Sequence, residues 1–208
     1  VDEFIMGVGK KIETTVDENR VTVRDYGRGI PLGKIIDCVS IINTGGKYND
    51  DVFQFSVGLN GVGTKAVNAL SSDFLVRSHR DGKFAEAQFS RGKLLKERKG
   101  KCEGVPDGTH IEFVPDEEIF GDYAFVDEFI EQRMWNYACL NRTLRLYFNK
   151  QKFESKRGLF DLLEAEVGND ITYEIGYYVS DMVEFSFTHT GNYGENHFSF
   201  VNGQFTSD

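Results

Sequence analysis

The chain has 208 residues, enough for one large domain or for one domain and part of a second. Hydrophobic residues make up 40% of it, with 18 Phe and 9 Tyr, so it can bury a sizeable core. The formal net charge of −9 predicts a surface that as a whole repels nucleic acid, which argues against tight DNA binding by this chain alone. No apolar run is long enough to span a membrane and no signal peptide is visible, so we expect a cytoplasmic protein without membrane contact.

The first half of the chain alternates between helical and extended patterns. Residues 1–8 have apolar side chains at helical spacing from the first residue, so we expect the chain to be a piece of a longer protein. Residues 11–16 and 20–25 alternate around a turn and predict a β-hairpin. Residues 33–43 and 62–70 predict helices, and the polar, glycine-containing stretch 45–57 between them predicts a lid-like loop.

The second half predicts a strand meander followed by helices and further strands. We expect strands at 74–78, 84–90, 93–99, 110–114 and 143–148, and helices at 125–140 and 159–167. After residue 168 the chain predicts strands only, at 172–179, 183–188 and 198–201, whose alternating aromatics favour a sheet core. The order of elements predicts an antiparallel or mixed sheet with helices on one face, an α+β fold, with a domain boundary near Gly168.

Residues 25–31 read Asp-Tyr-Gly-Arg-Gly-Ile-Pro and follow the second strand of the hairpin. A carboxylate at the end of a strand can accept a hydrogen bond from an exocyclic amine, and glycines let a flat ring approach the main chain. Taken alone, however, Asp-x-Gly-x-Gly is more often a tight turn between a strand and a loop.

Residues 58–63 read Gly-Leu-Asn-Gly-Val-Gly and open the helix predicted at 62–70. Backbone N–H groups at the start of a helix favour a phosphate ligand. The alternative without a binding role is a flexible loop before a helix. An adenine acceptor followed by a phosphate cradle is the layout of an ATP site, and the two motifs together are far more specific than either alone.

Five motifs occur in the same order as in a known family: residues 25–31, Thr-Gly-Gly-Lys at 44–47, residues 58–63, Val-Asn-Ala-Leu at 67–70 and Asp-Gly-Thr at 107–109. On these residues the chain resembles the ATPase region of type IIA DNA topoisomerase B subunits (gyrase B and topoisomerase IV B). That family shares the GHKL, or Bergerat-type, α/β sandwich with Hsp90, MutL and histidine kinases. The resemblance implies a GHKL ATP-binding domain over 1–168, and then the start of a transducer domain over 169–208.

The resemblance also implies a set of nucleotide-binding residues. Asp25 is expected to accept the adenine amino group, with a water network completed by Thr109. Arg28 is expected either to stack near the base edge or, as we favour, to pair with Glu3 across the pocket mouth. For Lys47 two roles are left open, a cationic partner for phosphate and a solvated surface charge. The full expected set is Asp25, Arg28, Gly29, Pro31, Lys47, Gly58, Leu59, Asn60, Gly61, Val62, Gly63, Thr64 and Thr109.

Three positions depart from the family pattern. Tyr26 stands where these topoisomerases mostly have Asn, either as a surface substitution or as a change to the pocket rim. Asn60 replaces the usual His, and its amide can still donate to phosphate. Gln54 stands where relatives commonly have Lys, which weakens the case for a second cation in the lid.

The resemblance implies ATP and Mg²⁺ as cofactors, but places the general base and the Mg²⁺ ligand upstream of Val1 and the γ-phosphate lysine beyond Asp208. We therefore expect no catalytic residue and no metal ligand within these 208 residues, weak nucleotide binding at most, and no turnover. Four histidines without metal spacing agree with this expectation, and Cys38, Cys102 and Cys139 predict reduced thiols.

The function implied is that of the ATPase subunit of a type II topoisomerase, with topoisomerase IV B preferred over gyrase B. Its implied partners are the topoisomerase A subunit, a second copy of the ATPase subunit on ATP binding, and DNA in the full complex. One alternative is a noncatalytic ATP-binding switch of the same fold, such as a chaperone or repair module. Another is a plain α+β interaction domain, which would bind no nucleotide.

Overall fold

The computed structural model describes residues 1–42, 62–201 and 203–206. Its helices are α1 (Asp2–Ile5), α2 (Ile35–Ser40), α3 (Gly63–Ala69), α4 (Glu117–Phe120), α5 (Asp127–Leu140) and α6 (Leu159–Val167). Its strands are β1 (Lys11–Asp17), β2 (Arg20–Asp25), β3 (Ser71–Arg80), β4 (Lys83–Ser90), β5 (Lys93–Lys101), β6 (Gly108–Pro115), β7 (Arg145–Phe148), β8 (Gln151–Phe153), β9 (Gly176–Val179), β10 (Glu184–Phe187), β11 (Phe200–Val201) and β12 (Gln204–Phe205).

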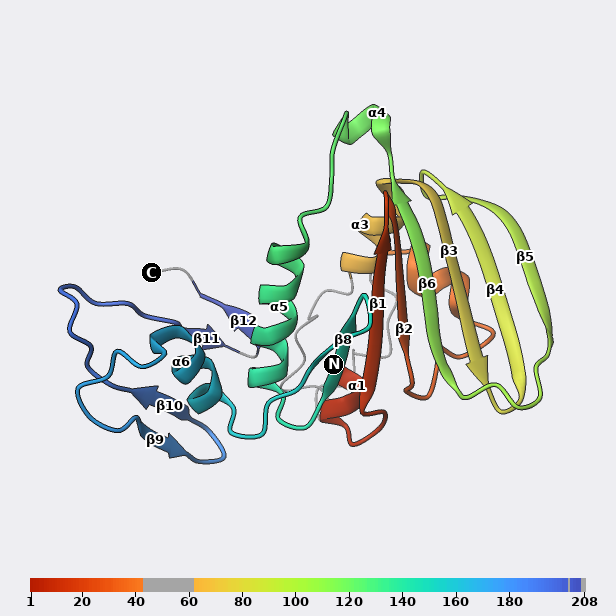
Figure 1. Cartoon of the computed structure of the whole chain (residues 1–208). Helices are drawn as coiled ribbons and strands as arrows, with labels where there is room; N and C mark the ends of the chain where they lie inside the picture. The colour runs from red at the N-terminus through yellow and green to blue at the C-terminus, as the bar shows by residue number, and fades with distance from the viewer. Residues whose placement is uncertain (43–61, 202, 207–208) are drawn as a thin grey trace.

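Eight of these strands form one twisted sheet in the order β5-β4-β3-β6-β2-β1-β7-β8 (Figure 1). The β1–β7 pair is parallel and the other neighbours are antiparallel, so the sheet is mixed, as the sequence predicts. Its hairpins turn through paired residues with positive φ, at Asp81-Gly82 and Arg91-Gly92. Two consecutive positive φ angles match the right-handed twist of the flanking strands, which explains why the meander folds locally.

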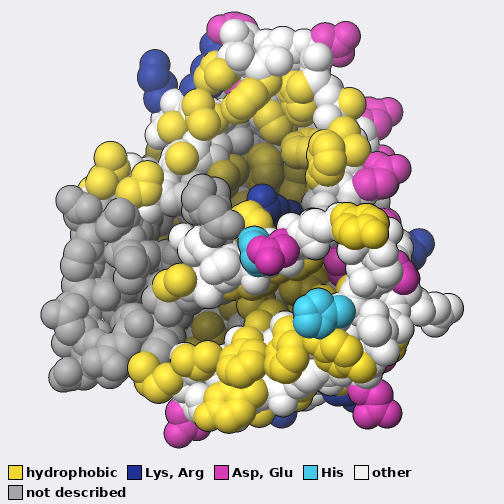
Figure 2. Space-filling view, turned by 90° about the vertical axis from the view of Figure 1, so that its left-hand side faces the viewer, with side chains coloured by type: hydrophobic (Ala, Val, Ile, Leu, Met, Phe, Trp, Pro, Cys, Tyr) yellow, Lys and Arg dark blue, Asp and Glu magenta, His cyan; other side chains and the backbone are white. Residues whose placement is uncertain are grey.

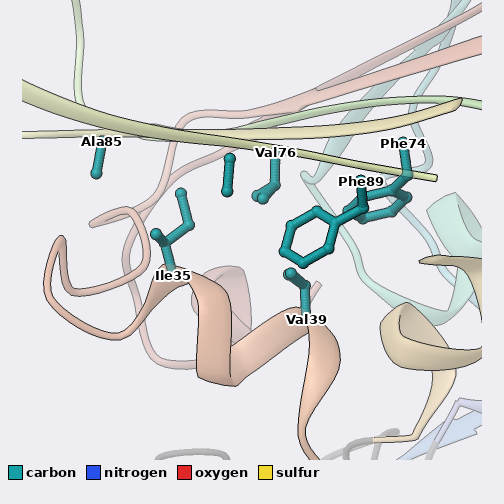
Figure 3. Packing of buried hydrophobic residues seen from close by; sticks show 7 residues of the cluster. Ile35, Val39, Phe74, Val76, Ala85 and Phe89 are labelled. Atoms are coloured by element: carbon teal, nitrogen blue, oxygen red, sulfur yellow. The ribbon is translucent and has the colours of Figure 1, made fainter. Parts of the chain in front are cut away.

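Helices cover one face of this sheet. Ile35 and Val39 of α2 point at the buried Phe74, Val76, Ala85 and Phe89 of β3 and β4 (Figure 3). The rings of Phe74 and Phe89 meet edge to face, with centroids 6.1 Å apart. A second cluster lies where α5 packs on β7 and β8, and includes the buried Ala138, Leu144, Leu146, Phe148 and Phe153. The result is a two-layer α+β sandwich.

Several element boundaries differ from those expected from the sequence. The first helix is only α1, because Gly7 and Gly9 follow it with φ of +80° and +71°. Strand β3 is longer than predicted and begins at Ser71. Helix α4, which the sequence does not predict, begins after Asp116, whose side chain accepts the N–H of Glu118. The short strands β8 and β12 are further elements that the sequence does not predict.

The aromatics of the C-terminal strands do not form the closed core that their alternation favours. Tyr173, Phe185, Phe187 and Phe198 are between 41% and 53% exposed. Hydrophobic side chains gather on this face of the molecule, over the region of β9 to β12 (Figure 2). Phe185 stacks on Tyr178 and Phe187, so the rings contact one another while one side stays open. Within the described parts of the chain, every helix is too short or too polar to cross a membrane.

Candidate nucleotide site

Asp25 is the last residue of β2, and its carboxylate lies against the start of β6. Oδ1 accepts the backbone N–H of Gly27 at 2.9 Å and that of Thr109 at 3.2 Å. Asp25 is opposite Ile12 in the register, and Ile12 packs into the α5 cluster, so the carboxylate lies on the helix-covered face. No donor among the described residues reaches its second oxygen, Oδ2. One oxygen thus holds the turn, and the other remains able to accept a hydrogen bond.

Thr109 lies on the same face as Asp25. It is 8% exposed and stands opposite the fully buried Ser78 in the β3–β6 register. The structure therefore brings Asp25 and Thr109 together from adjacent strands, although they are 84 residues apart in sequence. Gly29 and Pro31 follow in the turn, and the Pro31 carbonyl accepts the N–H of Lys34 at 2.8 Å as the chain enters α2.

The glycines of this turn are required by contacts between backbone segments. A Cβ on Gly29, whose φ is +73°, would lie 2.5 Å from the His79 carbonyl oxygen and 2.8 Å from Ser78 Oγ. A Cβ on Gly108 would lie 2.2 Å from the Asp25 carbonyl oxygen. Real Cβ atoms do not approach so closely, so the turn lies directly on β3 and β6. The space that a Gly29 side chain would need is thus filled by β3.

Arg28 pairs with Glu3, as the favoured interpretation of the sequence has it. Its Nε and Nη2 donate to the two Glu3 carboxylate oxygens at 2.9 and 2.8 Å, and its backbone N–H donates to Oε2 at 3.1 Å. These hydrogen bonds hold the pKa of the Glu3 carboxyl below its usual value. The bidentate contact fixes α1 against the turn, and a Cβ on Gly27 would lie 2.9 Å from Glu3 Cγ.

Tyr26 points away from this site. Its hydroxyl donates to Glu13 of β1, and its ring lies 5.0 Å from both Lys11 Nζ and the Arg24 guanidinium carbon. The Glu13 carboxylate raises the pKa of the Tyr26 hydroxyl. Because Glu13 stands opposite Arg24 and Asp25 stands opposite Ile12, Tyr26 belongs to the open face of the sheet. This placement favours a substitution outside the pocket rim.

Part of the expected phosphate cradle is described. Val62 precedes α3, and Gly63 and Thr64 form its exposed first turn. Helix α3 contacts β6, the strand that holds Thr109, on the helix-covered face of the sheet. Outside the described residues lie Lys47, Gln54, Gly58, Leu59, Asn60 and Gly61, together with the expected lid.

Three residues support the site although no role was predicted for them from the sequence. Ser78 Oγ donates to the Ile30 carbonyl at 2.7 Å and ties the turn to β3. His79 is 9% exposed, burial lowers its imidazole pKa, and its Nδ1 has no hydrogen-bond partner among the described residues. Asn68 donates to the Val39 carbonyl at 3.0 Å and ties α3 to α2. Only Asn68 had a signal, as part of the Val-Asn-Ala-Leu motif.

Other features of the described residues point to no competing reactive site. No group of three His, Cys, Asp or Glu side chains there could hold a metal ion. All three cysteines are free, and burial raises the pKa of Cys139 to about 12, so its thiol is unreactive. A cavity of about 710 Å³ lies in the C-terminal part of the chain, between α6 and β10, with Leu159, Leu162 and Phe185 in its wall.

Comparison with known proteins identifies the family. The chain is 60% identical over its whole length to the B subunit of DNA topoisomerase 4 from Borreliella burgdorferi, of which it covers 35%. It is 32% identical over 97% of its length to the B subunit of DNA gyrase from Thermus thermophilus, of which it covers 36%. The chain thus spans about a third of the length of these curated relatives. No protein-family model matches it.

Solved structures agree with the sequence relatives. The 43K ATPase domain of Thermus thermophilus gyrase B, in complex with an aminocoumarin, matches 93% of this chain and 55% of that one, with a TM-score of 0.71 and 28% identity. The ATPase region of Saccharomyces cerevisiae topoisomerase II matches 99% of this chain and 59% of that one at a TM-score of 0.83, and its 18% identity supports the fold alone. By sequence and by fold, the chain belongs to the family of type IIA DNA topoisomerase B subunits, within their ATPase region.

Proposed function

We propose that this chain binds ATP, with Asp25 as the acceptor for the adenine amino group. The observation that carries the proposal is that the two oxygens of the Asp25 carboxylate have different hydrogen-bond partners. Oδ1 is held by the N–H groups of Gly27 and Thr109, and Oδ2 has no donor among the described residues. A carboxylate fixed by two backbone amides is pre-oriented, so a ligand amine meets it with little loss of side-chain entropy.

The same geometry selects adenine over guanine. Adenine presents an exocyclic amino group at the position where guanine presents a carbonyl oxygen. The adenine amine can donate to Oδ2 of Asp25. The guanine carbonyl oxygen would instead be repelled by Oδ2 and would leave this oxygen without a ligand donor. Thr109, Gly29 and Pro31 are proposed to line the pocket beside the base, and Arg28 is proposed to shape its mouth through Glu3.

The triphosphate is proposed to lie at residues 58–64, with Lys47 as a candidate cationic partner. Support comes from the motif itself and from the start of α3, which lies on the face of the sheet that holds Asp25. Mg²⁺ is a proposed cofactor of the family's reaction. The described residues supply no cluster of ligands for it, so we place no magnesium ligand on them and derive no step through the metal.

For this 208-residue chain we propose weak nucleotide binding without turnover. Besides Asp25, the acidic side chain of Glu3 contacts the turn, and Arg28 holds both of its oxygens. A carboxylate with a lowered pKa and two charge-assisted hydrogen bonds is a poor general base, since it takes up a proton from water reluctantly. Loss of a general base typically costs roughly 10²–10⁴-fold in rate.

In the whole protein, we propose that ATP binding drives DNA strand passage by a type II topoisomerase. Topoisomerase IV B is preferred over gyrase B, because the identity is 60% to a topoisomerase IV B subunit and between 29% and 35% to gyrase B subunits. The proposed partners are the A subunit, a second copy of the ATPase subunit on ATP binding, and DNA. Residues 1–168 are proposed as the ATP-binding domain and residues 169–208 as the start of a transducer domain. A noncatalytic ATP-binding switch of the same fold is the alternative.

Calorimetric titration with non-hydrolysable analogues of ATP and GTP tests the adenine assignment. The proposal predicts weak binding of the ATP analogue, and binding of the GTP analogue weaker by about tenfold or more, as expected for one mispaired hydrogen-bonding group. Equal affinity for both analogues would contradict the role of Asp25. No binding of either analogue at millimolar concentration would contradict the proposal that this chain binds ATP.

A further inference from the structure

Strand β5 has a charge opposite to that of the chain as a whole. Its nine residues, Lys-Leu-Leu-Lys-Glu-Arg-Lys-Gly-Lys, include five cations and one anion, whereas the chain has a formal net charge of −9. The acidic balance predicts a surface that repels DNA, but the structure shows that positive charge is concentrated along one strand. We call the five cations and the adjacent Lys83 the β5 strip; its members are Lys83, Lys93, Lys96, Arg98, Lys99 and Lys101.

The position of β5 exposes this charge. It is an edge strand of the eight-stranded sheet (Figure 1), and every one of its residues is exposed. At about 3.3 Å per residue, the cations of β5 span roughly 27 Å and alternate between the two faces of the sheet edge. This length is somewhat less than one turn of duplex DNA, which is about 34 Å. The register of β5 places Lys96 and Arg98 beside Gln88 and Glu86, on the open face of the sheet.

Two carboxylates near the strip are already neutralised. Glu86 is bonded to Arg77, and its Oε1 lies 3.7 Å from Arg98 Nε. Glu97 lies 2.5 Å from Lys99. Within the described residues, Lys93, Lys96 and Lys101 form no ion pair. Three ammonium groups on one strand are therefore available to an external anion.

One end of the strip brings like charges face to face. Lys83 stands directly opposite Lys101 in the β4–β5 register, and opposite Arg80 in the β3–β4 register. Like charges at directly opposite positions destabilise a sheet. One carboxylate, Asp81, lies 3.7 Å from Arg80 and is 85% exposed at its side chain. A polyanion along β5 would relieve this repulsion.

We propose that the β5 strip binds the phosphate backbone of duplex DNA. The choice of DNA as the polyanion rests on the proposed topoisomerase function; the presence of a polyanion site rests on the charge pattern alone. The strip lies four strands from β2, about 19 Å from Asp25 at ordinary strand spacing, so DNA there would leave the nucleotide site accessible. Backbone contacts of this kind position DNA without reading its sequence.

A competing explanation is protection of an open sheet edge, since lysines on an edge strand discourage pairing with another strand. That role predicts aggregation when the lysines are removed, but no affinity for DNA. The DNA assignment predicts instead a salt-dependent affinity, because each neutralised phosphate releases counterions.

The experiment measures fluorescence anisotropy of a labelled duplex of about 30 base pairs with the whole chain, from about 50 to 200 mM salt and without nucleotide. We expect weak binding that falls roughly 10²-fold over this range, as for about four phosphate contacts. The triple variant Lys93→Gln/Lys96→Gln/Lys101→Gln should lower the affinity about tenfold or more. It should also reduce the slope of log affinity against log salt concentration by about 2.7, as expected for the loss of three phosphate contacts. Lys93→Arg/Lys96→Arg/Lys101→Arg should bind as the parent chain does.

The matched control removes three exposed cations elsewhere, as Lys10→Gln/Arg133→Gln/Lys150→Gln, and should leave the affinity within about twofold because these residues lie outside the strip. Equal losses in the two triple variants, or no salt-dependent binding, would overturn the proposal. Binding of poly-glutamate as tight as that of DNA would assign the strip to an acidic protein instead. Asp25→Asn should leave DNA binding intact, which separates this test from that of the ATP site.

Discussion

The backbone N–H of Thr109 donates to the Asp25 carboxylate at 3.2 Å, across the junction of β6 and β2. This contact joins the end of one strand to the start of another that is distant in sequence. It also orients the carboxylate, because the same oxygen accepts the N–H of Gly27. The proposed adenine acceptor is thus a part of the sheet, and its position depends on the fold more than on the flexible side-chain torsions of an exposed Asp.

Two substitutions at Asp25 separate ligand binding from folding. Asp25→Asn keeps an acceptor for Gly27 and Thr109 but places an amide donor where the ligand amine should approach. Asp25→Ala removes both the acceptor for Gly27 and Thr109 and the acceptor for the ligand amine. We expect each to weaken adenine-nucleotide binding by about 1–3 kcal/mol, and only Asp25→Ala to lower the free energy of unfolding as well. Calorimetry and urea denaturation measure the two effects. Asp17→Asn, at the end of β1, is the control, and equal losses there would contradict the assignment.

Gly29→Ala should destabilise the chain. The added Cβ would meet the His79 carbonyl oxygen at 2.5 Å, and the φ of +73° costs a non-glycine residue about 1–3 kcal/mol before any clash. Gly33→Ala is the matched control, since nothing lies within 4 Å of its Cβ. Thermal or urea unfolding compares the two. Similar stabilities for both variants would show that the turn does not lie on β3 as described.

The Glu3–Arg28 pair should make stability depend on pH in acid. The folded-state pKa of Glu3 is below its ordinary value of 4.5, so the pair contributes fully above about pH 4.5. That contribution is lost as the pH falls through the lower, folded-state pKa. Both side chains are more than a third exposed, so we expect only about 0.2–1 kcal/mol.

Urea unfolding across this pH window should show a smaller pH dependence in Arg28→Gln than in the parent chain. Some dependence remains in both, because other carboxylates with lowered pKa values, such as Glu13 and Asp116, titrate there too. Arg133→Gln, an exposed position on α5, should behave as the parent does. Identical pH profiles for parent and Arg28→Gln would mean that the pair does not form in solution.

Tyr26→Phe should lower stability without affecting nucleotide binding. The substitution removes the hydroxyl that donates to Glu13, at a cost of about 1 kcal/mol, but keeps the ring between Lys11 and Arg24. Tyr193→Phe, at a fully exposed position, should change neither property. Nucleotide affinity that falls with Tyr26→Phe would place Tyr26 at the pocket rim.

The sequence predicts what depends on local pattern and on motifs. The β1–β2 hairpin, the β3–β5 meander and α5 follow from alternation, turn residues and helical spacing. The Glu3–Arg28 pair follows from the family resemblance. The reason for Gly29 could not be found in this way, because it lies in contacts with residues 78, 79 and 108.

The C-terminal strands show a second limit. Alternation of aromatics indicates that the two faces of a strand differ, but it does not show what covers either face. Phe185 and Phe187 therefore have the pattern of core residues and yet are 47% and 53% exposed. Likewise β12, of two residues, depends on its pairing with β11 and has no periodic signal of its own.

The most direct test of the central claim is an NMR titration of the ¹⁵N-labelled chain with a non-hydrolysable ATP analogue, because shifts report even weak binding. The Asp25 assignment predicts that the amide signals of Gly27 and Thr109 are among those that shift most, since both amides donate to the carboxylate that receives the adenine. In Asp25→Asn these movements should vanish at the same ligand concentrations. Shifts that leave Gly27 and Thr109 unmoved and gather elsewhere, or that persist unchanged in Asp25→Asn, would contradict it.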